Sequence, residues 1–578
     1  MSTENVKNKI APAGTVKACD DLGRVLPTSK EAGSRRKNRY VGLFYFLWSG
    51  EHSRDVRPLD IEKLLEADPQ AGYRPDDDEW GKYSVMHHWG EPLFGYYFSK
   101  DEWVMRRHVE MLTYSDIDFL VFDTTNAVIY EETAKMMLRL LSEYRAMGFN
   151  TPKAMFYTNT ASGKTVQMLY DSIYSKGYMS DSWFCFGGKP LIIAREEECS
   201  PETREFFTIK MSQWPNEPTK QGGWPWMDFE RPQRVFENLD GEEEIINVSI
   251  AQHPQIRFGD SAMYGETTNR GRSFHNGAED KSEGAWKFGY NFQEQWDRAL
   301  ETDPPYVFVT GWNEWIAGRW GGTPERPLCF VDCVNLEYSR DAEPMRGGYF
   351  DNYYMQLISN VRHYKGTDEA EVQPELVTDG DGEVTMDLVA EKGLCYANFP
   401  KGGFERSCKG YDTFYKDDSG RHAIRFAYTA HDKENLYFCA ETEGPIEKYD
   451  YNSAWMQLFL NVENLSKSDY SKRWKGYNYI ANGYQFTGTR TTLEACVCDG
   501  DRSLEADTFR PCAVIDFEYK DNRLMVRIPK KCVGIGPEDR FEIQFKWMDS
   551  RRRVRGEEDF YTSGDAAPIG RLNYVFLG

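Results

Sequence analysis

The chain has 578 residues, with 92 acidic against 70 basic side chains and a net charge of −22. Aromatic residues make up 15% of it, which excludes a disordered polymer, because such chains lack the rings that build a core. The apolar run Tyr40–Trp48 is far shorter than the roughly 20 residues that span a bilayer. Nucleic-acid binders need a basic face, so the negative charge argues against them. The composition predicts a large soluble protein without nucleic-acid or membrane partners.

Twelve cysteines are spread from Cys19 to Cys532. The close pairs Cys329/Cys333 and Cys496/Cys498 lack a matching second pair, which argues against a zinc ribbon. Residues 1–39 are polar and contain no apolar stretch of the kind that signal peptides carry. We therefore expect free thiols and a cytoplasmic location; the alternative is a secreted or surface protein whose leader has been removed.

After residues 1–39, which we interpret as an extended arm over the main domain, short apolar runs alternate with helix-like stretches. The runs predict these strands: Val41–Leu47, Asp118–Phe122, Lys153–Tyr157, Pro190–Ala194, Phe206–Met211, Ile245–Ile250 and Tyr306–Thr310. Helices are predicted over Asp101–Tyr114, Glu131–Met147 and Lys164–Lys176. This α/β alternation over residues 40–365 predicts parallel strands joined by crossovers. We favour a (β/α)₈ TIM barrel over a doubly wound sheet, because long segments such as 49–100 and 253–290 follow strand ends.

The pattern changes near residue 366. Residues 366–383 are acidic, contain Gly and Pro, and are predicted to be a linker. From residue 384 to 578 the apolar period is 2, which predicts an antiparallel β-sandwich. Its predicted strands are His422–Tyr428, Asn435–Ala440, Trp455–Val462, Tyr477–Ala481, Ala513–Tyr519, Arg523–Ile528 and Phe541–Trp547.

The strongest local motif is Gly-Trp-Asn-Glu-Trp-Ile-Ala-Gly-Arg, residues 311–319, directly after the strand Tyr306–Thr310. It places Glu314 between two tryptophans at the carboxyl end of a barrel strand, where barrel enzymes carry catalytic groups. Neighbouring rings raise the pKa of a carboxyl group and suit it to acid–base catalysis. The structural alternative is a salt bridge between Glu314 and Arg319.

Other carboxylates follow strand ends or lie in the long loops. Asp123 ends a predicted strand and is a candidate second catalytic group, or alternatively a turn or helix-capping residue. Glu91 lies in an aromatic stretch at residues 86–97, and Glu266 lies in a Gly- and Asn-rich loop that is alternatively plain surface. Rings and hydrogen-bonding heads of this kind suit a sugar. The candidate substrate-binding residues are Trp48, His87, His88, Trp89, His253, Trp312, Asn313, Trp315 and Arg319.

Motifs for other chemistries are absent from the sequence. It contains no G-x-S-x-G elbow, no Walker loop, no dinucleotide fingerprint and no H-E-x-x-H pair. Adjacent histidines such as His87 and His88 point apart, so we expect no metal and no cofactor. What remains is carboxylate chemistry, with two carboxyl groups placed across a glycosidic bond.

The N-E-W motif, together with the Phe-Tyr-Phe-Leu-Trp run at residues 44–48, resembles the glycoside hydrolase family 99 and 71-like group, which includes WbsX-like proteins. The resemblance covers residues 40–365 and implies a (β/α)₈ barrel. Family 99 enzymes cleave α-mannosides with retention, through the substrate's own 2-hydroxyl, and carry two glutamates in an N-E-W-x-E arrangement. The first matches Glu314, but Ala317 stands at the second position. Neither the mechanism nor the mannoside specificity therefore carries over.

The tail has a resemblance of its own. The segments 455–462, 474–479 and 435–438 are similar to the sandwich of family 9 carbohydrate-binding modules, which implies either sugar binding between rings or a packing domain without ligand. The leading hypothesis is a glycoside hydrolase with a carbohydrate substrate. Its rival is a non-catalytic glycan-binding protein on a degenerate barrel. A third hypothesis is a glycosyltransferase, but the sequence contains no nucleotide-binding fingerprint that would support it.

Overall fold

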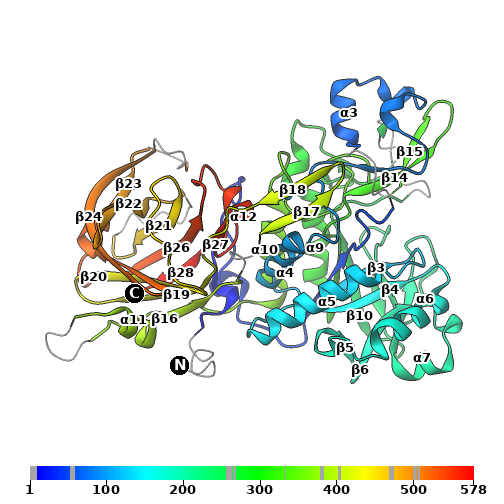
Figure 1. Ribbon diagram of the computed structural model, residues 1–578. Helices are drawn as coiled ribbons and strands as arrows, with labels where there is room; N and C mark the ends of the chain where they lie inside the picture. The colour runs from blue at the N-terminus through cyan, green and yellow to red at the C-terminus, as the bar shows by residue number, and fades with distance from the viewer. Residues whose placement is uncertain are drawn as a thin grey trace. The chain divides into compact units, whose positions relative to one another are not determined.

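The protein is described by a computed structural model. It covers residues 10–52, 59–254, 263–264, 268–331, 333–377, 383–400, 405–467, 474, 476–498, 504 and 508–578, with the side chains of 484–487 excepted. The chain forms two compact units (Figure 1). Residues 36–366 and 408–415 form one, called here the barrel unit, and residues 1–35, 367–407 and 416–578 form the other, the sheet unit.

Eight parallel strands run through the described part of the barrel unit. In spatial order they are β8 (Gly223–Pro225), β7 (Thr208–Gln213), β6 (Lys189–Ala194), β4 (Lys153–Thr158), β3 (Phe119–Thr124), β1 (Tyr40–Tyr45), β13 (Tyr306–Thr310) and β10 (Glu243–Ser249). The first and last approach each other, because Asn247 of β10 and Thr310 of β13 both hydrogen-bond the carbonyl of Trp226, just after β8. The sheet is thus a nearly closed barrel, and the predicted TIM-barrel class is confirmed.

Seven of these strands coincide with the predicted runs. The eighth, β8, has only three residues and contains Gly223 and Pro225, so it carries no alternating pattern that a sequence reading could detect. Two short strands flank the barrel: β9 (Val235–Glu237) is antiparallel to β10, and β5 (Cys185–Phe186) is antiparallel to β6.

Helices follow most of the strands, as predicted for this fold. Their bounds are α4 (Glu102–Tyr114), α5 (Glu131–Ala146), α6 (Ser162–Leu169), α7 (Pro201–Phe206), α9 (Tyr290–Thr302) and α10 (Asn352–Lys365). In α5, Met137, Leu140 and Leu141 are fully buried, whereas the acidic residues of the first turn face solvent. No described helix is both long and apolar enough to cross a membrane.

The interior of the barrel is packed largely with rings. Phe44, Phe119, Trp224 and Phe308 belong to one buried cluster, in which Phe44 and Phe308 meet edge to face at 5.7 Å. Gly42 allows this packing, because a Cβ there would lie 2.1 Å from the ring of Phe119. A share of the aromatic surplus in the composition is therefore barrel core.

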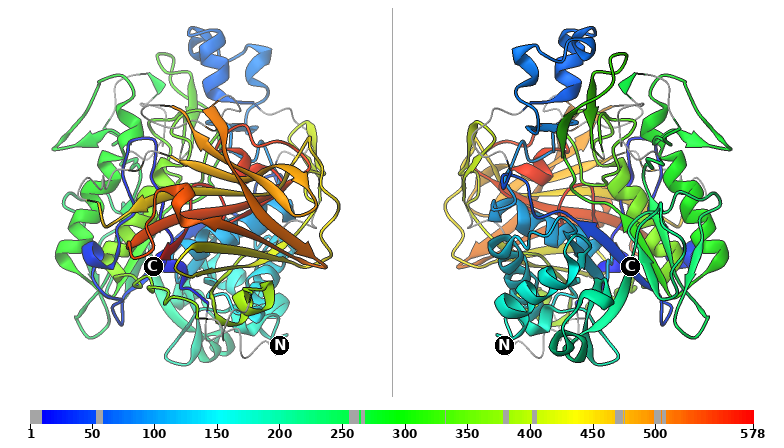
Figure 2. Two further views of the ribbon diagram at one scale, coloured as in Figure 1. Left: turned by 90° about the vertical axis from the view of Figure 1, so that its left-hand side faces the viewer. Right: turned by 90° about the vertical axis from the view of Figure 1, so that its right-hand side faces the viewer.

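The sheet unit contains one antiparallel sheet. In spatial order its strands are β16 (Leu394–Ala397), β19 (Ile424–His431), β20 (Asn435–Thr442), β25 (Arg523–Pro529), β24 (Phe509–Lys520), β23 (Arg490–Cys496), β22 (Tyr479–Thr487), β21 (Ala454–Asn464) and β26 (Phe541–Ser550), followed by β27 (Asp565–Ala567) and β28 (Tyr574–Leu577), which both pair with β26. These strands, yellow to red, lie face-on in the left view of Figure 2.

The two ends of this sheet pack against each other. The ring of Phe438 on β20 lies 5.4 Å from Phe545 on β26 and 5.6 Å from Phe576 on β28. A single sheet thus folds into two layers around a ring-rich core, which confirms the predicted sandwich. The N-terminal segment belongs to this unit: Ile10 pairs with Cys395, and Lys17 pairs with Asn573.

Candidate active site

Glu314 follows β13 at the carboxyl end of the barrel. Its carboxylate Oε2 lies 2.6 Å from Nη2 of Arg340, and the two side chains are only 3% and 2% exposed. The guanidinium also lies 5.0 Å from the ring centre of Trp226. An arginine in contact favours the charged form of a carboxylate, whereas burial disfavours it. The partner is therefore Arg340, and not Arg319 as in the structural alternative drawn from the sequence.

Arg319 binds elsewhere in the loops. It lies on β14 (Ile316–Gly321), is buried, and donates to the carbonyls of Gly81 and Pro75. Its cation is thus used to hold a loop in place.

The backbone around Glu314 is fixed by two side chains. The amide of Asn313 bonds the backbone of Phe46 twice, accepting from its N–H at 2.9 Å and donating to its carbonyl at 3.0 Å. Because Phe46 follows β1, these bonds tie the ends of β1 and β13 together. On the other side, the N–H of Glu314 donates to Oδ1 of Asp341 at 2.7 Å. The position of the Glu314 carboxylate is therefore set before any substrate binds.

Asp341 and Glu343, like Arg340, come from one segment that our sequence interpretation did not single out. Asp341 is fully buried, and burial raises its pKa from 3.8 to about 6, against the opposing effects of the Glu314 N–H and Arg272. Glu343 accepts hydrogen bonds from Tyr97 (2.7 Å), His108 (2.8 Å) and the indole of Trp315. Asp341 binds the backbone of Glu314 and Glu343 binds the side chain of the next residue, Trp315, so both carboxylates stabilise the segment that carries Glu314.

The signal in that segment was weak. Residues 339–346, Ser-Arg-Asp-Ala-Glu-Pro-Met-Arg, have the composition of an exposed loop. Only the structure shows that Arg340, Asp341 and Glu343 are all nearly inaccessible.

Asp123 lies on the barrel-facing side of β3. Phe119 and Val121, at the alternate positions before it, belong to the barrel core, so Asp123 occupies the next inward position at the carboxyl end. It is 6% exposed, and its Oδ1 accepts from the N–H of Thr125 at 3.0 Å. This hydrogen bond forms an Asx turn, which agrees with the alternative role of Asp123 as a turn residue. Its inward position at the end of β3 is also compatible with a catalytic role.

The tryptophans named from the sequence differ in their exposure. Trp89 and Trp315 stack on each other at 4.4 Å and are 0% and 2% exposed. Trp312 is fully buried and lies edge-on to His108 at 5.7 Å. Trp48 is only half-buried, and its ring meets His52 at 5.6 Å. Of these four rings, Trp48 is the one with a surface left for a ligand.

The histidine candidates are buried and neutral. His87 and His88 lie on β2 (Met86–His88), and burial lowers the pKa of His87 to about 4 and that of His88 to about 3. His253 is also fully buried; its Nε2 lies 2.6 Å from the carbonyl of Tyr338, and burial together with Arg340 lowers its pKa to about 3. Uncharged rings in these places suit hydrogen bonding and packing.

Two carboxylate candidates from the sequence remain, Glu91 and Glu266. Glu91 pairs with Lys63 at 2.5 Å and with Arg346 at 3.1 Å. Glu266 lies outside the described residues. Ala317 is buried in β14 and pairs with His87 of β2. Among the residues that the structure describes, no group of three His, Cys, Asp or Glu side chains could hold a metal ion.

Comparison with known proteins gives a distant likeness. Two solved structures of the GH99 endo-alpha-mannosidase from Bacteroides thetaiotaomicron, one in complex with bis-tris-propane, are similar to this chain at 14% and 15% identity. Each covers 56% of this chain, and 97% and 96% of its own, with a TM-score of 0.33. No protein-family model and no curated protein matches. Family 99 is also the family that the motif at residues 311–319 resembles.

Proposed function

We propose that this chain is a glycoside hydrolase in which Glu314 acts as the charged catalytic carboxylate. The observation that carries the proposal is the contact between Glu314 and Arg340 at the carboxyl end of β13. Barrel enzymes place their catalytic groups at this end of the strands. A carboxylate that is held charged suits the base or nucleophile of glycoside hydrolysis, and not the acid.

Asp123 is the proposed second carboxyl group. In the barrel, β1 lies between β3 and β13, so the ends of β3 and β13 are two strand spacings apart, or about 10 Å. Side chains that point inward from two such ends approach each other to within the roughly 5–10 Å that separates the carboxyl pairs of glycosidases. Glu91 ranks below Asp123 because its carboxylate is already engaged by Lys63 and Arg346, and Asp341 acts as a positioning residue because it has no exposed surface.

A polysaccharide screen with product detection tests the proposal. The panel holds plant, yeast and bacterial glycans, with α-mannans included because of the family 99 resemblance. Hydrolysis of one member that is lost in Glu314→Gln and in Asp123→Asn supports both assignments. If activity survives in Asp123→Asn but is lost in Glu314→Gln, the assignment of Asp123 as the second catalytic carboxyl group is wrong and that of Glu314 stands.

A second candidate is a glycan-binding protein that does not cleave its ligand. Ala317 favours it, since the position of the second family glutamate is a buried alanine. In that case the wild-type protein and Glu314→Gln would both bind a glycan of the panel, and neither would release products.

A further inference from the structure

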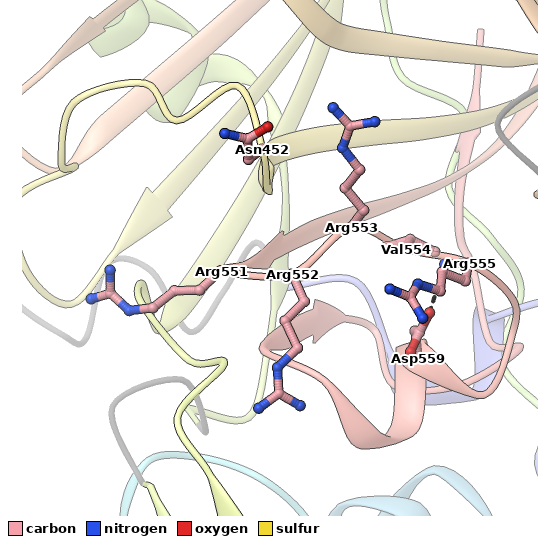
Figure 3. A pocket seen from close by; sticks show the side chains of 7 residues that line it. All are labelled: Asn452, Arg551, Arg552, Arg553, Val554, Arg555 and Asp559. Atoms are coloured by element: carbon pink, nitrogen blue, oxygen red, sulfur yellow. Dashed lines mark hydrogen bonds between the residues drawn. The ribbon is translucent and has the colours of Figure 1, made fainter.

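Four arginines occupy five consecutive positions in the sheet unit, although the chain as a whole carries a charge of −22. They lie in the segment Arg551–Arg555, between the end of β26 and α12 (Asp559–Thr562). This segment lines a cavity of about 720 Å³, together with Asn452 and Asp559 (Figure 3). Such a concentration of guanidinium groups points to an anionic ligand.

The segment has a fixed backbone. The N–H of Arg551 donates to the carbonyl of Ser419 at 2.8 Å, and the carbonyl of Arg552 accepts from the N–H of Ala454 at 3.1 Å. At the end of β26, Asp549 forms a buried ion pair with Arg421 at 2.7 Å. The side chains therefore project from an ordered base, which lowers the entropic cost of binding.

Two of the four guanidinium groups are already neutralised. Arg551 pairs with Glu447 at 3.2 Å, and Arg552 pairs with Asp418 at 3.1 Å. These pairs are exposed, and their carboxylates compete with an anion for the same two cations.

The other two arginines differ. Within the described part of the chain, neither Arg553 nor Arg555 forms an ion pair with a carboxylate. The Asp559 carboxylate accepts from the backbone N–H of Arg555 at 2.6 Å. Arg553 donates to the carbonyl of Tyr451 at 3.4 Å and lies 5.3 Å from the centre of its ring, which is 57% exposed. The cavity is thus lined by two guanidinium groups that form no ion pair with a described carboxylate, and one of them contacts the exposed ring of Tyr451.

We propose that this cavity binds an acidic carbohydrate, with uronate carboxylates on Arg553 and Arg555, and that a sugar ring reaches Tyr451, which lies outside the cavity lining next to Asn452 and contacts Arg553. The planar fork of arginine matches a carboxylate with two parallel hydrogen bonds, and a flat ring offers an apolar surface to the C–H face of a sugar. A nucleic acid fits less well, because the net negative charge repels a long polyanion more than a short acidic oligosaccharide. The site does not depend on hydrolysis at Glu314.

Calorimetric titration of the full chain tests the site. The probes are a trisaccharide of uronic acids and a neutral trisaccharide. We expect the triuronide to bind, the neutral sugar not to bind, and affinity to fall with added salt. Arg553→Gln/Arg555→Gln should weaken triuronide binding about a hundred-fold, because each of the two lost charged hydrogen bonds is worth about a factor of ten. Tyr451→Ala should weaken it several-fold with no change in charge.

The matched control is Arg490→Gln/Arg510→Gln. These arginines are exposed on β23 and β24, so the double variant loses the same charge while the cavity stays intact. It should bind the triuronide as the wild type does.

Three results would overturn the site. One is undiminished binding by the Arg553/Arg555 variant, and another is equal loss in the Arg490/Arg510 control. The third is displacement of the triuronide by an oligonucleotide of the same charge at lower concentration, which would assign the cavity to nucleic acid.

Discussion

Replacing Arg340 with methionine removes the cation from Glu314 and keeps much of the side-chain volume. The pair is joined at 2.6 Å, and its side chains are 2% and 3% exposed, so water cannot take over the role of the guanidinium. Removing one partner of a buried ion pair costs about 3–5 kcal/mol, because the remaining charge stays in a poorly solvating environment. We expect Arg340→Met to lower the free energy of unfolding of the barrel unit by this amount.

Hydrogen exchange read by mass spectrometry at increasing urea measures this loss, because peptides of β10 and β13 report on the barrel unit separately from the sheet unit. The double variant Arg340→Met/Glu314→Gln should regain part of the loss, since it no longer holds a buried charge at this position. Arg298→Met is the matched control: its partner Glu301 is 70% exposed, so the change should stay below about 1 kcal/mol. A loss below 1 kcal/mol in Arg340→Met, or no recovery in the double variant, would refute the buried-pair reasoning.

Three further predictions concern the same end of the barrel. The folded state holds the proton of Asp341 more tightly than the unfolded chain, so wild-type stability falls as pH rises from about 4 to about 6. Asp341→Asn should remove that slope and be about 3 kcal/mol more stable than the wild type at pH 7, as measured by urea unfolding at pH 4 and pH 7. Trp89→Ala should cost about 3–5 kcal/mol of barrel stability because its stack with Trp315 is buried, whereas Trp48→Ala should cost less and instead raise KM for a glycan; equal stability losses would contradict the distinction. Asn313→Ala should cost about 2–3 kcal/mol and accelerate hydrogen exchange at the end of β1, because two buried backbone groups of Phe46 lose their partner.

The fold was largely predictable because its signals are local. Seven barrel strands are runs of buried β-branched and aromatic residues, and α5 has a clear apolar stripe. The strand β8 could not be predicted in this way, since it is held by its place between neighbouring elements and not by its own three residues. In the sheet unit, β27 was missed for the same reason, because its three residues gain their strand conformation from pairing with β26, whereas β28 is an aromatic and β-branched run that the sequence interpretation overlooked.

The candidate site was predictable only in part. The motif at residues 311–319 led directly to Glu314, because its place after a strand is visible in the sequence. The partner Arg340 was missed, since an ion pair across 26 positions of chain leaves no local pattern. The burial of the tryptophans also could not be predicted from the sequence. Trp89, Trp312 and Trp315 are of the residue type that stacks on sugars, but their rings pack against other protein groups.

The aromatic surplus now has a more specific meaning. Rings such as Phe44 and Phe308 fill the barrel, and Phe438, Phe545 and Phe576 fill the sandwich. Trp48, which is half-buried, and Tyr451, which is exposed, are two aromatic residues whose rings keep accessible surface that a carbohydrate could contact. The charge pattern is likewise uneven, because a basic segment lies in an acidic chain.

The rate of product release from a cleaved glycan, compared between the wild-type protein and Glu314→Gln, tests the central claim most directly. The substitution keeps the size of the side chain and removes its charge, so we expect the rate to fall about 10²–10⁴-fold. Glu301→Gln, an exposed carboxylate on α9, is the control and should retain the wild-type rate. Hydrolysis by Glu314→Gln at the wild-type rate would contradict the assignment of Glu314 as the catalytic carboxylate.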